Sequence, residues 1–211
     1  MLLNPLKEGK MVIKDIGWRN LGNDGTGTGL VVSNIVNGIA GGKAIQFEGS
    51  NDLITISGTD FVSLNNFSIS MWFKTTSTNA LTNLMSTRTN TASSDGYMFR
   101  FGNGTGTMDF FAYADGFKST AISKDLRDGQ WHHVVGTSDG TNIILYCDGE
   151  FASSTPTGAD ITPGSANLIL GNSNDNTRDY IGLIDHTIIF DKALTNLEVT
   201  DLFNAQRSGK R

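Results

Sequence analysis

The feature that most constrains the fold is the regular interruption of the apolar stretches by turn-forming residues. Asp128-Gly129, Asp139-Gly140 and Asp148-Gly149 are three such breaks, and clusters of Gly, Asn, Asp, Ser and Thr recur along the chain. Their spacing of roughly 8–15 residues is typical of an all-β sandwich or barrel. Helical periodicity is almost absent between the breaks, so the sequence predicts a strand-and-turn protein.

Apolar residues alternate with polar ones between these turns. In Phe67–Phe73, positions 67, 69, 71 and 73 share one face, and the intervening positions are polar except for Trp72. The strongest local prediction is a hairpin, in which His132–Ser138 and Ile143–Cys147 pair through the Asp139-Gly140 turn. Other predicted strands are Ala44–Phe47, Leu53–Ile56, Tyr97–Phe101, Met108–Tyr113, Asn167–Leu170 and Ile181–Phe190.

Composition agrees with this interpretation and excludes several classes of function. The chain has 211 residues with 25 Gly and only 3 Pro, and 18% of its residues are charged. A chain of this length buries roughly 70% of its surface, which is enough for one domain without cross-links. The net charge of −5 and the lack of a basic cluster argue against nucleic-acid binding. The single cysteine, Cys147, excludes an intramolecular disulfide and a Cys-based zinc site, and we expect it on a buried strand.

The two ends of the chain differ from the middle. Thr195 and Glu198 fit a capping box, and Leu197, Val199, Leu202 and Phe203 form an apolar stripe, so a short helix is predicted down to about residue 205. Residues 206–211 are predicted to be a flexible basic tail. Residues 1–20 are either a docked strand or an arm, and residues 21–205 are expected to form the domain.

Targeting signals are not recognisable in the sequence. The first residues lack the basic and apolar regions of a secretory signal, and no run of 18 apolar residues occurs. We therefore expect synthesis in the cytoplasm and no membrane span. A function outside the cell would require lysis, a particle or a signal beyond this sequence.

Four segments, in order, resemble the laminin G-like subgroup of the concanavalin A-like lectin/glucanase superfamily. They are Gly42–Ile56, Phe67–Lys74, Asp128–Glu150 and Ile169–Thr195. The resemblance implies a two-sheet antiparallel jelly roll with a concave face, followed by the short helix. It implies no particular activity, because this scaffold carries lectins, glycosidases, adhesion modules and structural domains. Large aromatic residues of these motifs are expected in the core: Trp72, Phe73 and Trp131.

Catalytic residues do not form a recognisable pattern. Glycoside hydrolysis needs two opposed carboxylates, and the catalytic members of the superfamily commonly carry Glu-x-Asp-x-x-Glu on one strand, which this chain lacks. No Gly-x-Ser-x-Gly turn indicates a serine nucleophile. His132 and His133 should point to opposite faces of a strand, so they cannot jointly bind a metal. We therefore expect a protein that is not an enzyme and rank glycoside hydrolysis third among the functions. The few glutamates are scattered over separate elements: Glu8, Glu48, Glu150 and Glu198.

Calcium is the cofactor that the resemblance implies. Its site would lie at the edge of the sandwich and would use Asp185 with Asn23 and Asp24, because calcium takes carboxylate and amide oxygens. The family usually has a second acid directly after Asp185, whereas this chain has His186. The alternative is that Asp185 accepts hydrogen bonds from backbone amides at a strand end.

Ligand recognition is expected in the variable loops, at residues 87–95, 102–107, 114–118 and 172–179. A sugar site needs an exposed aromatic ring together with planar polar groups. Phe117 is the best candidate for the exposed ring. The full set of predicted ligand-binding residues is Arg88, Tyr113, Phe117, Asn172, Asn174 and Arg178.

These observations favour a non-catalytic module that binds a surface ligand, with a carbohydrate as the leading hypothesis and a glycan or other cell-surface ligand as the partner. The alternative is a structural or decoration protein of a virus particle, which would contact other virion proteins. That alternative would explain why a module of a family usually found outside cells has neither disulfides nor an export signal in this sequence.

Overall fold

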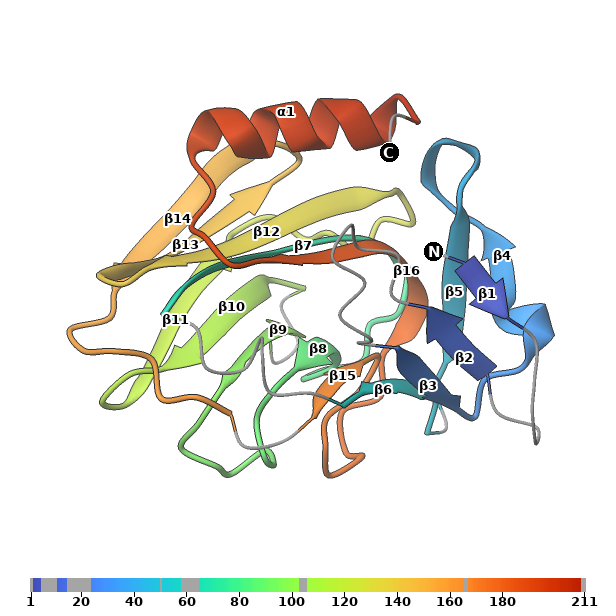
Figure 1. The fold of residues 1–211 in the computed structure, drawn as a ribbon, viewed down its shortest axis with the longest axis horizontal. Coiled ribbons are helices and arrows are strands. Elements are labelled where there is room, and N and C mark those ends of the chain that lie inside the picture. Colours follow the sequence, from blue (N-terminus) through green and yellow to red (C-terminus); the bar gives the residue numbers. More distant parts are fainter. Residues whose placement is uncertain are drawn as a thin grey trace.

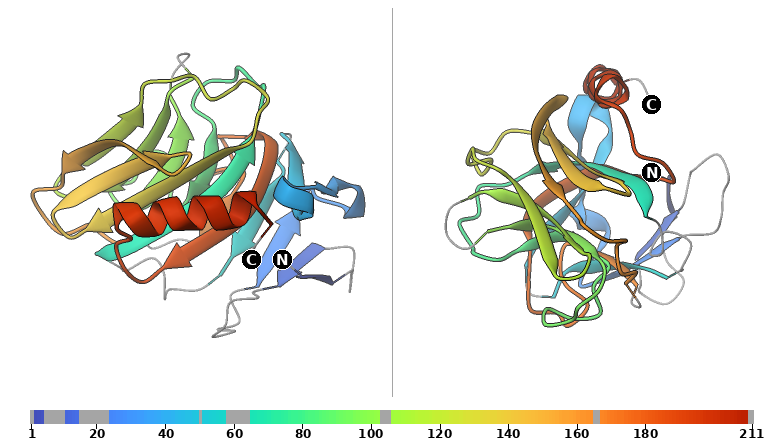
Figure 2. Two further views of the ribbon diagram at one scale, coloured as in Figure 1. Left: turned by 90° about the horizontal axis from the view of Figure 1, so that it is seen from above. Right: turned by 90° about the vertical axis from the view of Figure 1, so that its left-hand side faces the viewer.

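The computed structural model describes residues 2–4, 11–14, 24–49, 51–57, 65–102, 106–164 and 167–209. Over these residues the chain forms two antiparallel sheets packed face to face, with an α-helix on the outside of one of them (Figures 1 and 2). This is the jelly-roll sandwich expected from the sequence.

The first sheet has nine strands within the described residues, in the order β1-β2-β3-β6-β15-β8-β9-β10-β11. Its strands are β1 (Leu2–Asn4), β2 (Met11–Lys14), β3 (Gly25–Thr28), β6 (Leu53–Ile56), β15 (Leu168–Leu170), β8 (Asn83–Ser86), β9 (Tyr97–Phe101), β10 (Met108–Tyr113) and β11 (Phe117–Ile122). Because β1 and β2 continue the sheet beyond β3, the described part of residues 1–20 is a docked segment and not an arm.

The second sheet has seven strands in the described part of the chain, in the order β14-β13-β12-β7-β16-β5-β4. These strands are β14 (Glu150–Pro156), β13 (Asn142–Cys147), β12 (His132–Asp139), β7 (Asn66–Lys74), β16 (Ile181–Phe190), β5 (Lys43–Glu48) and β4 (Ile35–Asn37). Two short 3-10 helices, η1 (Val32–Asn34) and η2 (Ile39–Gly41), flank β4. The predicted hairpin is confirmed, because Val134–Ser138 pair with Ile143–Cys147.

The main core lies between the two sheets and is rich in aromatic rings. Phe67 of β7 stacks on Tyr97 of β9 with ring centres 4.5 Å apart, and Phe99 lies 4.9 Å from Phe110. All four residues are fully buried. The alternation seen in the sequence directs these residues inward, and the residues between them on β9 and β10 point to the outer face of the nine-stranded sheet.

A second apolar layer lies on the outer face of the seven-stranded sheet, beneath α1 (Asn196–Arg207) (Figure 1). Thr195 accepts the Glu198 backbone N–H and so caps the helix, as the sequence predicted. Trp72 points out from β7 into this layer and stacks on Phe203 with ring centres 5.4 Å apart. Its Nε1–H donates to Gln206 Oε1 at 2.7 Å. None of the helices in the described ranges is long and apolar enough to cross a membrane.

Three details of the sequence interpretation were wrong. Gln206 is not part of a flexible tail: α1 continues to Arg207, and Gln206 is buried because its amide meets Trp72. Trp131 is only partly buried, since it precedes β12 instead of lying within it. Cys147 is also only partly buried at the end of β13. Trp72 is buried as expected, but under α1 and not between the sheets.

Candidate functional site

The outer face of the nine-stranded sheet carries arginine and aromatic side chains side by side. In β9 and β10 every second residue points outward, which places Arg100 on this face opposite Asp109 and over the Phe111 ring, with Tyr113 further along β10. In β11, Phe117 pairs with Tyr113. We call this surface the arginine–aromatic face, and its members are Asn83, Ser86, Arg88, Met98, Arg100, Phe111, Tyr113, Phe117 and Arg178. The helix α1 lies on the opposite side of the sandwich (Figure 1).

The aromatic rings of this face are held in place by the arginines. The guanidinium carbon of Arg88 lies 4.8 Å from the centre of the Phe117 ring, and that of Arg100 lies 4.1 Å from the centre of Phe111. Phe117 packs edge to face against Tyr113 at 5.3 Å. Phe117 is nevertheless 54% exposed. The face therefore presents an apolar ring to solvent directly beside cationic hydrogen-bond donors.

A shallow hollow of about 20 Å³ lies next to these rings. Its lining residues are Asn83, Ser86, Arg88, Asn90, Thr91, Met98, Arg100, Ser173 and Arg178. Three polar atoms of these residues are buried without a hydrogen-bond partner among the described residues: Asn83 Oδ1, Arg88 Nε and Arg100 Nε. Unpaired buried polar groups are costly, so the side chains around the hollow are not fully satisfied by the described contacts.

The structure brings four of the six predicted ligand-binding residues together, namely Arg88, Tyr113, Phe117 and Arg178. Phe117 lies on β11, whereas the sequence placed it in a loop. The sequence interpretation missed Arg100 and Phe111, although their alternation with inward-facing residues of predicted strands could have revealed both. Asn83 was missed because β8 lacks an alternating pattern.

Asn172 and Asn174 lie behind the face and fix its loops. Asn172 is fully buried, donates to Asp179 Oδ1 at 2.7 Å, and accepts the backbone N–H of Arg178 at 3.0 Å. Asn174 donates to the backbone carbonyl of Arg88 at 2.8 Å. Both amides thus position the segments that carry Arg88 and Arg178.

The residues predicted to bind calcium are not assembled by the described contacts. Asp185 Oδ2 accepts the backbone N–H of Ile39 at 3.0 Å, and Oδ1 accepts that of His186 at 2.7 Å. Asp24 precedes a strand of the other sheet, and Asn23 lies outside the described residues. Within the described ranges, Asp185 belongs to no group of three metal-ligating side chains. These backbone contacts agree with the alternative role, but Asp185 lies at a bulge inside β16 and not at a strand end, and His186 Nδ1 also lies 3.0 Å from its Oδ1. Calcium binding stays a prediction.

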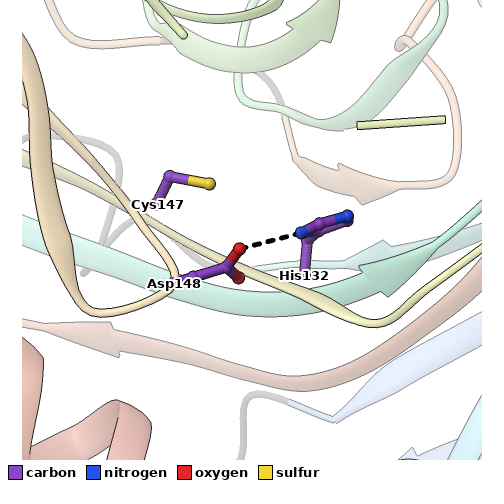
Figure 3. Close-up of side chains that lie close together, drawn as sticks. All are labelled: His132, Cys147 and Asp148. Carbon is purple, nitrogen blue, oxygen red and sulfur yellow. Dashed lines mark hydrogen bonds and ion pairs between the residues drawn. The ribbon is translucent and has the colours of Figure 1, made fainter. Parts of the chain in front are cut away.

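The group of side chains in the described residues that could hold a metal is His132, Cys147 and Asp148 (Figure 3). Their ligand atoms lie within 4.8 Å of one another. The same atoms already bind each other: His132 Nδ1 lies 2.9 Å from Asp148 Oδ2, and its Nε2 lies 3.1 Å from Asp128 Oδ1. Burial raises the pKa of the Cys147 thiol to about 12, with Asp148 adding to the effect. In this arrangement His132 and Asp148 form a hydrogen-bonded brace between β12 and the turn after β13.

His133 points to the opposite face of the sheet from His132, as predicted. Its ring lies beneath α1, 5.1 Å from Trp72, and its Nε2 hydrogen bonds Ser70 Oγ at 2.8 Å. Burial lowers the pKa of His133 from 6.5 to about 4. The hydrogen bond to Asp148 is the main cause that raises the pKa of His132. The pKa values of the two neighbouring histidines are therefore shifted in opposite directions.

His133 should make the domain less stable in mild acid. As the pH falls from 6.5 toward about 4, the unfolded chain binds a proton at this position and the folded chain does not. The free energy of unfolding should therefore decrease by about 2–3 kcal/mol between pH 7 and pH 4.5 from this residue alone. His132 works in the other direction: its stabilising contribution is present below pH 6.5 and is lost as the pH rises through its raised pKa.

Urea titrations of the wild type and His133→Leu at the two pH values measure the effect. The variant loses the bond to Ser70 at both pH values, but it should lack the acid-dependent part, so the difference between the two proteins should shrink toward pH 4.5. A difference that is the same at both pH values would show that His133 is protonated in the folded protein.

Comparison with known proteins agrees with this architecture. A family model described as the concanavalin A-like lectin/glucanases superfamily matches residues 48–200. The chain belongs to this superfamily. The match confirms the resemblance found in the sequence motifs. Among curated proteins, none matches the chain.

Several solved structures share the fold at low sequence identity. Domain 4 of AbnA, a GH43 extracellular arabinanase from Geobacillus stearothermophilus, solved in complex with arabinotriose, has a TM-score of 0.67 at 24% identity, over 84% of this chain and 87% of that one. The binding domain of Paraclostridial Mosquitocidal Protein 1 has a TM-score of 0.69 at 18% identity, over 97% of this chain. The botulinum neurotoxin serotype D binding domain has a TM-score of 0.67 at 19% identity, over 97% of this chain. The match covers only 51% and 50% of the two toxin domains.

Proposed function

We propose that this domain is a non-catalytic carbohydrate-binding module that holds a glycan on the arginine–aromatic face. The observation that carries the proposal is the exposed Phe117 ring, which is braced by Tyr113 and Arg88 beside a polar hollow. A sugar ring has an apolar face that packs on an aromatic side chain and a rim of hydroxyl groups that hydrogen bond to planar polar groups. Phe117 supplies the first surface, and Asn83, Ser86 and the arginines supply the second.

Two further observations support this function. The related arabinanase domain was solved in complex with arabinotriose, and the two toxin domains are described as binding domains. The residues that line the hollow include three arginines but neither Asp nor Glu. Acid–base hydrolysis of a glycosidic bond needs two carboxyl groups across the sugar. The lining is therefore suited to holding a glycan and not to cleaving it.

Phe117→Ala should weaken glycan binding at least about tenfold, because aromatic anchors contribute more than about 1.4 kcal/mol where they pack on the ligand. The matched control is Phe151→Ala, since Phe151 is 55% exposed on β14 of the other sheet. A glycan array followed by calorimetry on the best ligand measures both variants. Equal losses in the two variants, or no binding to any glycan by the wild type, would contradict the proposal.

Reducing-sugar release from mixed polysaccharides tests whether the module also cleaves its ligand, and we expect none. The virus-particle role remains the alternative hypothesis from the sequence. Co-sedimentation of the protein with assembled capsids or tails would support it, whereas a protein that stays in the supernatant would count against it.

A further inference from the structure

We propose that the glycan is acidic and that its carboxylate or sulfate group binds in the hollow between Arg88, Arg100 and Arg178. This inference rests on the proposed function, because it names the class of glycan that the same face would take.

The first observation is the concentration of positive charge. Three of the 16 Lys and Arg residues line this one hollow, in a chain with a net charge of −5. Its remaining lining residues are neutral. A neutral sugar needs no such excess, since amides and hydroxyl groups bind its hydroxyls equally well. An anionic sugar benefits from such an excess of positive charge, because guanidinium groups bind carboxylate and sulfate oxygens through two parallel hydrogen bonds.

The second observation is that these guanidinium groups keep donors in reserve. Arg88 Nε and Arg100 Nε are both buried without a hydrogen-bond partner. The Arg178 side chain forms no hydrogen bond or ion pair within the described part of the chain, and its backbone instead accepts from Asn83 and donates to Asn172. Arg88 and Arg100 stack on aromatic rings, and each uses Nη2 on a protein acceptor, Arg88 on the Ser93 carbonyl and Arg100 on Asp109 Oδ2. An oxyanion placed between them would meet preoriented donors.

Two nearby carboxylates accept hydrogen bonds from groups other than the three arginines. Asp175 accepts hydrogen bonds from Thr91, Ser173 and Thr177, and it does not line the hollow. Asp95 accepts hydrogen bonds from Thr89 and Ser93. Among the described residues, Asp109 forms an ion pair with Arg100 at 3.4 Å and so offsets part of the positive charge.

The lowered pKa of Arg88 also agrees with an anion site. Burial is the main cause that lowers the pKa of Arg88; Asp95 and Asp175 oppose it, and the neighbouring Arg100 and Arg178 add to it. Crowding of like charges is unfavourable in the unliganded protein, and a bound anion would relieve it. A bound anion would add to the partial compensation that Asp95, Asp175 and Asp109 already provide.

Paired oligosaccharides test the charge of the ligand. Trigalacturonate is compared with its methyl ester, sialyllactose with lactose, and a sulfated carrageenan oligosaccharide with its desulfated form, by calorimetry with the full chain. At least one acidic member should bind about tenfold more tightly than its neutral counterpart, and its affinity should fall with added salt. The carboxylate and sulfate pairs show which acidic group is preferred.

The variant Arg178→Gln tests whether the acidic group of the glycan binds in this hollow. Arg178 is partly exposed and has no ion-pair partner to lose among the described residues, so the variant should fold. It should weaken binding of the acidic oligosaccharide about tenfold and leave the neutral one within about twofold, and Arg178→Lys should restore part of the loss. Arg207→Gln removes the same charge from α1 on the other side of the sandwich and should change neither affinity.

Each contrary outcome has a separate meaning. Equal binding of the acidic and neutral members, still lost in Phe117→Ala, would overturn the acidic ligand and leave the carbohydrate-binding function standing. Equal losses in Arg178→Gln and Arg207→Gln would also overturn it, because binding would then follow overall charge and not this hollow. No binding by any oligosaccharide would reject both proposals.

Discussion

Replacing Trp72 with alanine should lower the free energy of unfolding by about 3–5 kcal/mol. The Trp72 side chain is 1% exposed, although it points away from the inter-sheet core. It fills the layer between β7 and α1, where it stacks on Phe203 and donates to Gln206. Its removal leaves a cavity beneath the helix and an unpaired buried amide oxygen, so both packing and hydrogen bonding are lost. Urea denaturation followed by fluorescence or circular dichroism measures the change.

Two variants separate these contributions. Trp72→Phe keeps an aromatic ring against Phe203 but loses the N–H donor, so we expect a loss of about 1–2 kcal/mol. Leu197→Ala is the control on α1, because Leu197 is 70% exposed and should change stability by less than about 0.5 kcal/mol. A loss below about 1 kcal/mol for Trp72→Ala would mean that α1 is not anchored by this side chain.

Asp185→Ala should cost about 2–4 kcal/mol, the second largest effect that we expect. The Asp185 carboxylate accepts the backbone N–H groups of Ile39 and His186, which are held apart from water. Oδ2 also packs against Gly38, where an added Cβ would lie only 2.1 Å away. Removing the carboxylate leaves two donors unpaired at the point where β16 is bulged and η2 begins.

Asp185→Asn should fall between the wild type and the alanine variant, because one amide oxygen can replace only part of the carboxylate. Asp201→Ala, at an exposed position of α1, serves as the control and should change stability by less than about 0.5 kcal/mol. Thermal unfolding in calcium and in EGTA adds the test of the metal. We expect the same loss in both, since the partners of Asp185 are backbone amides. A loss that is larger in calcium would instead support the calcium site implied by the family resemblance.

The two outer faces of the sandwich differ in whether the helix α1 covers them. On the seven-stranded sheet, α1 covers Trp72, His133 and the neighbouring serines, so every residue from Phe67 to Phe73 is buried. On the nine-stranded sheet, the segment from β8 to β11 leaves Phe117 54% exposed, whereas Arg88 beside it is 6% exposed. The helix α1 therefore covers part of one outer face, and the arginine–aromatic face lies on the other.

The sequence alone located most of the apolar strands and indicated the family. Period-two alternation and Gly-containing turns are local signals, and they located β5, β6, β7, β9, β10, β12, β13 and β16 to within a residue or two. The capping box located the start of α1 for the same reason, because Thr195 and Glu198 interact within one helical turn. The sequence interpretation did not predict β3, β4, β8, β11 and β14, which are short or carry few apolar residues to alternate.

Part of the site could also be read from local pattern. Phe117 and Tyr113 stood out as aromatic residues near turns, and both lie on the arginine–aromatic face. Arg88 and Arg178 were identified as polar loop residues, but nothing local indicates that segments 90 residues apart line one hollow with Arg100. That meeting depends on β15 inserting between β6 and β8, a pairing that alternation does not specify.

The sequence by itself thus determined which residues form strands, which positions alternate and which superfamily the chain belongs to, since these follow from backbone preferences and short-range spacing. The tertiary structure decided which of the two outer faces is closed by α1 and which remains open. It also decided that Asp185 serves backbone amides and that three arginines converge beside Phe117. The physical reason is that strand order and helix docking bring together residues distant in sequence, and only that proximity determines burial, charge and unpaired donors.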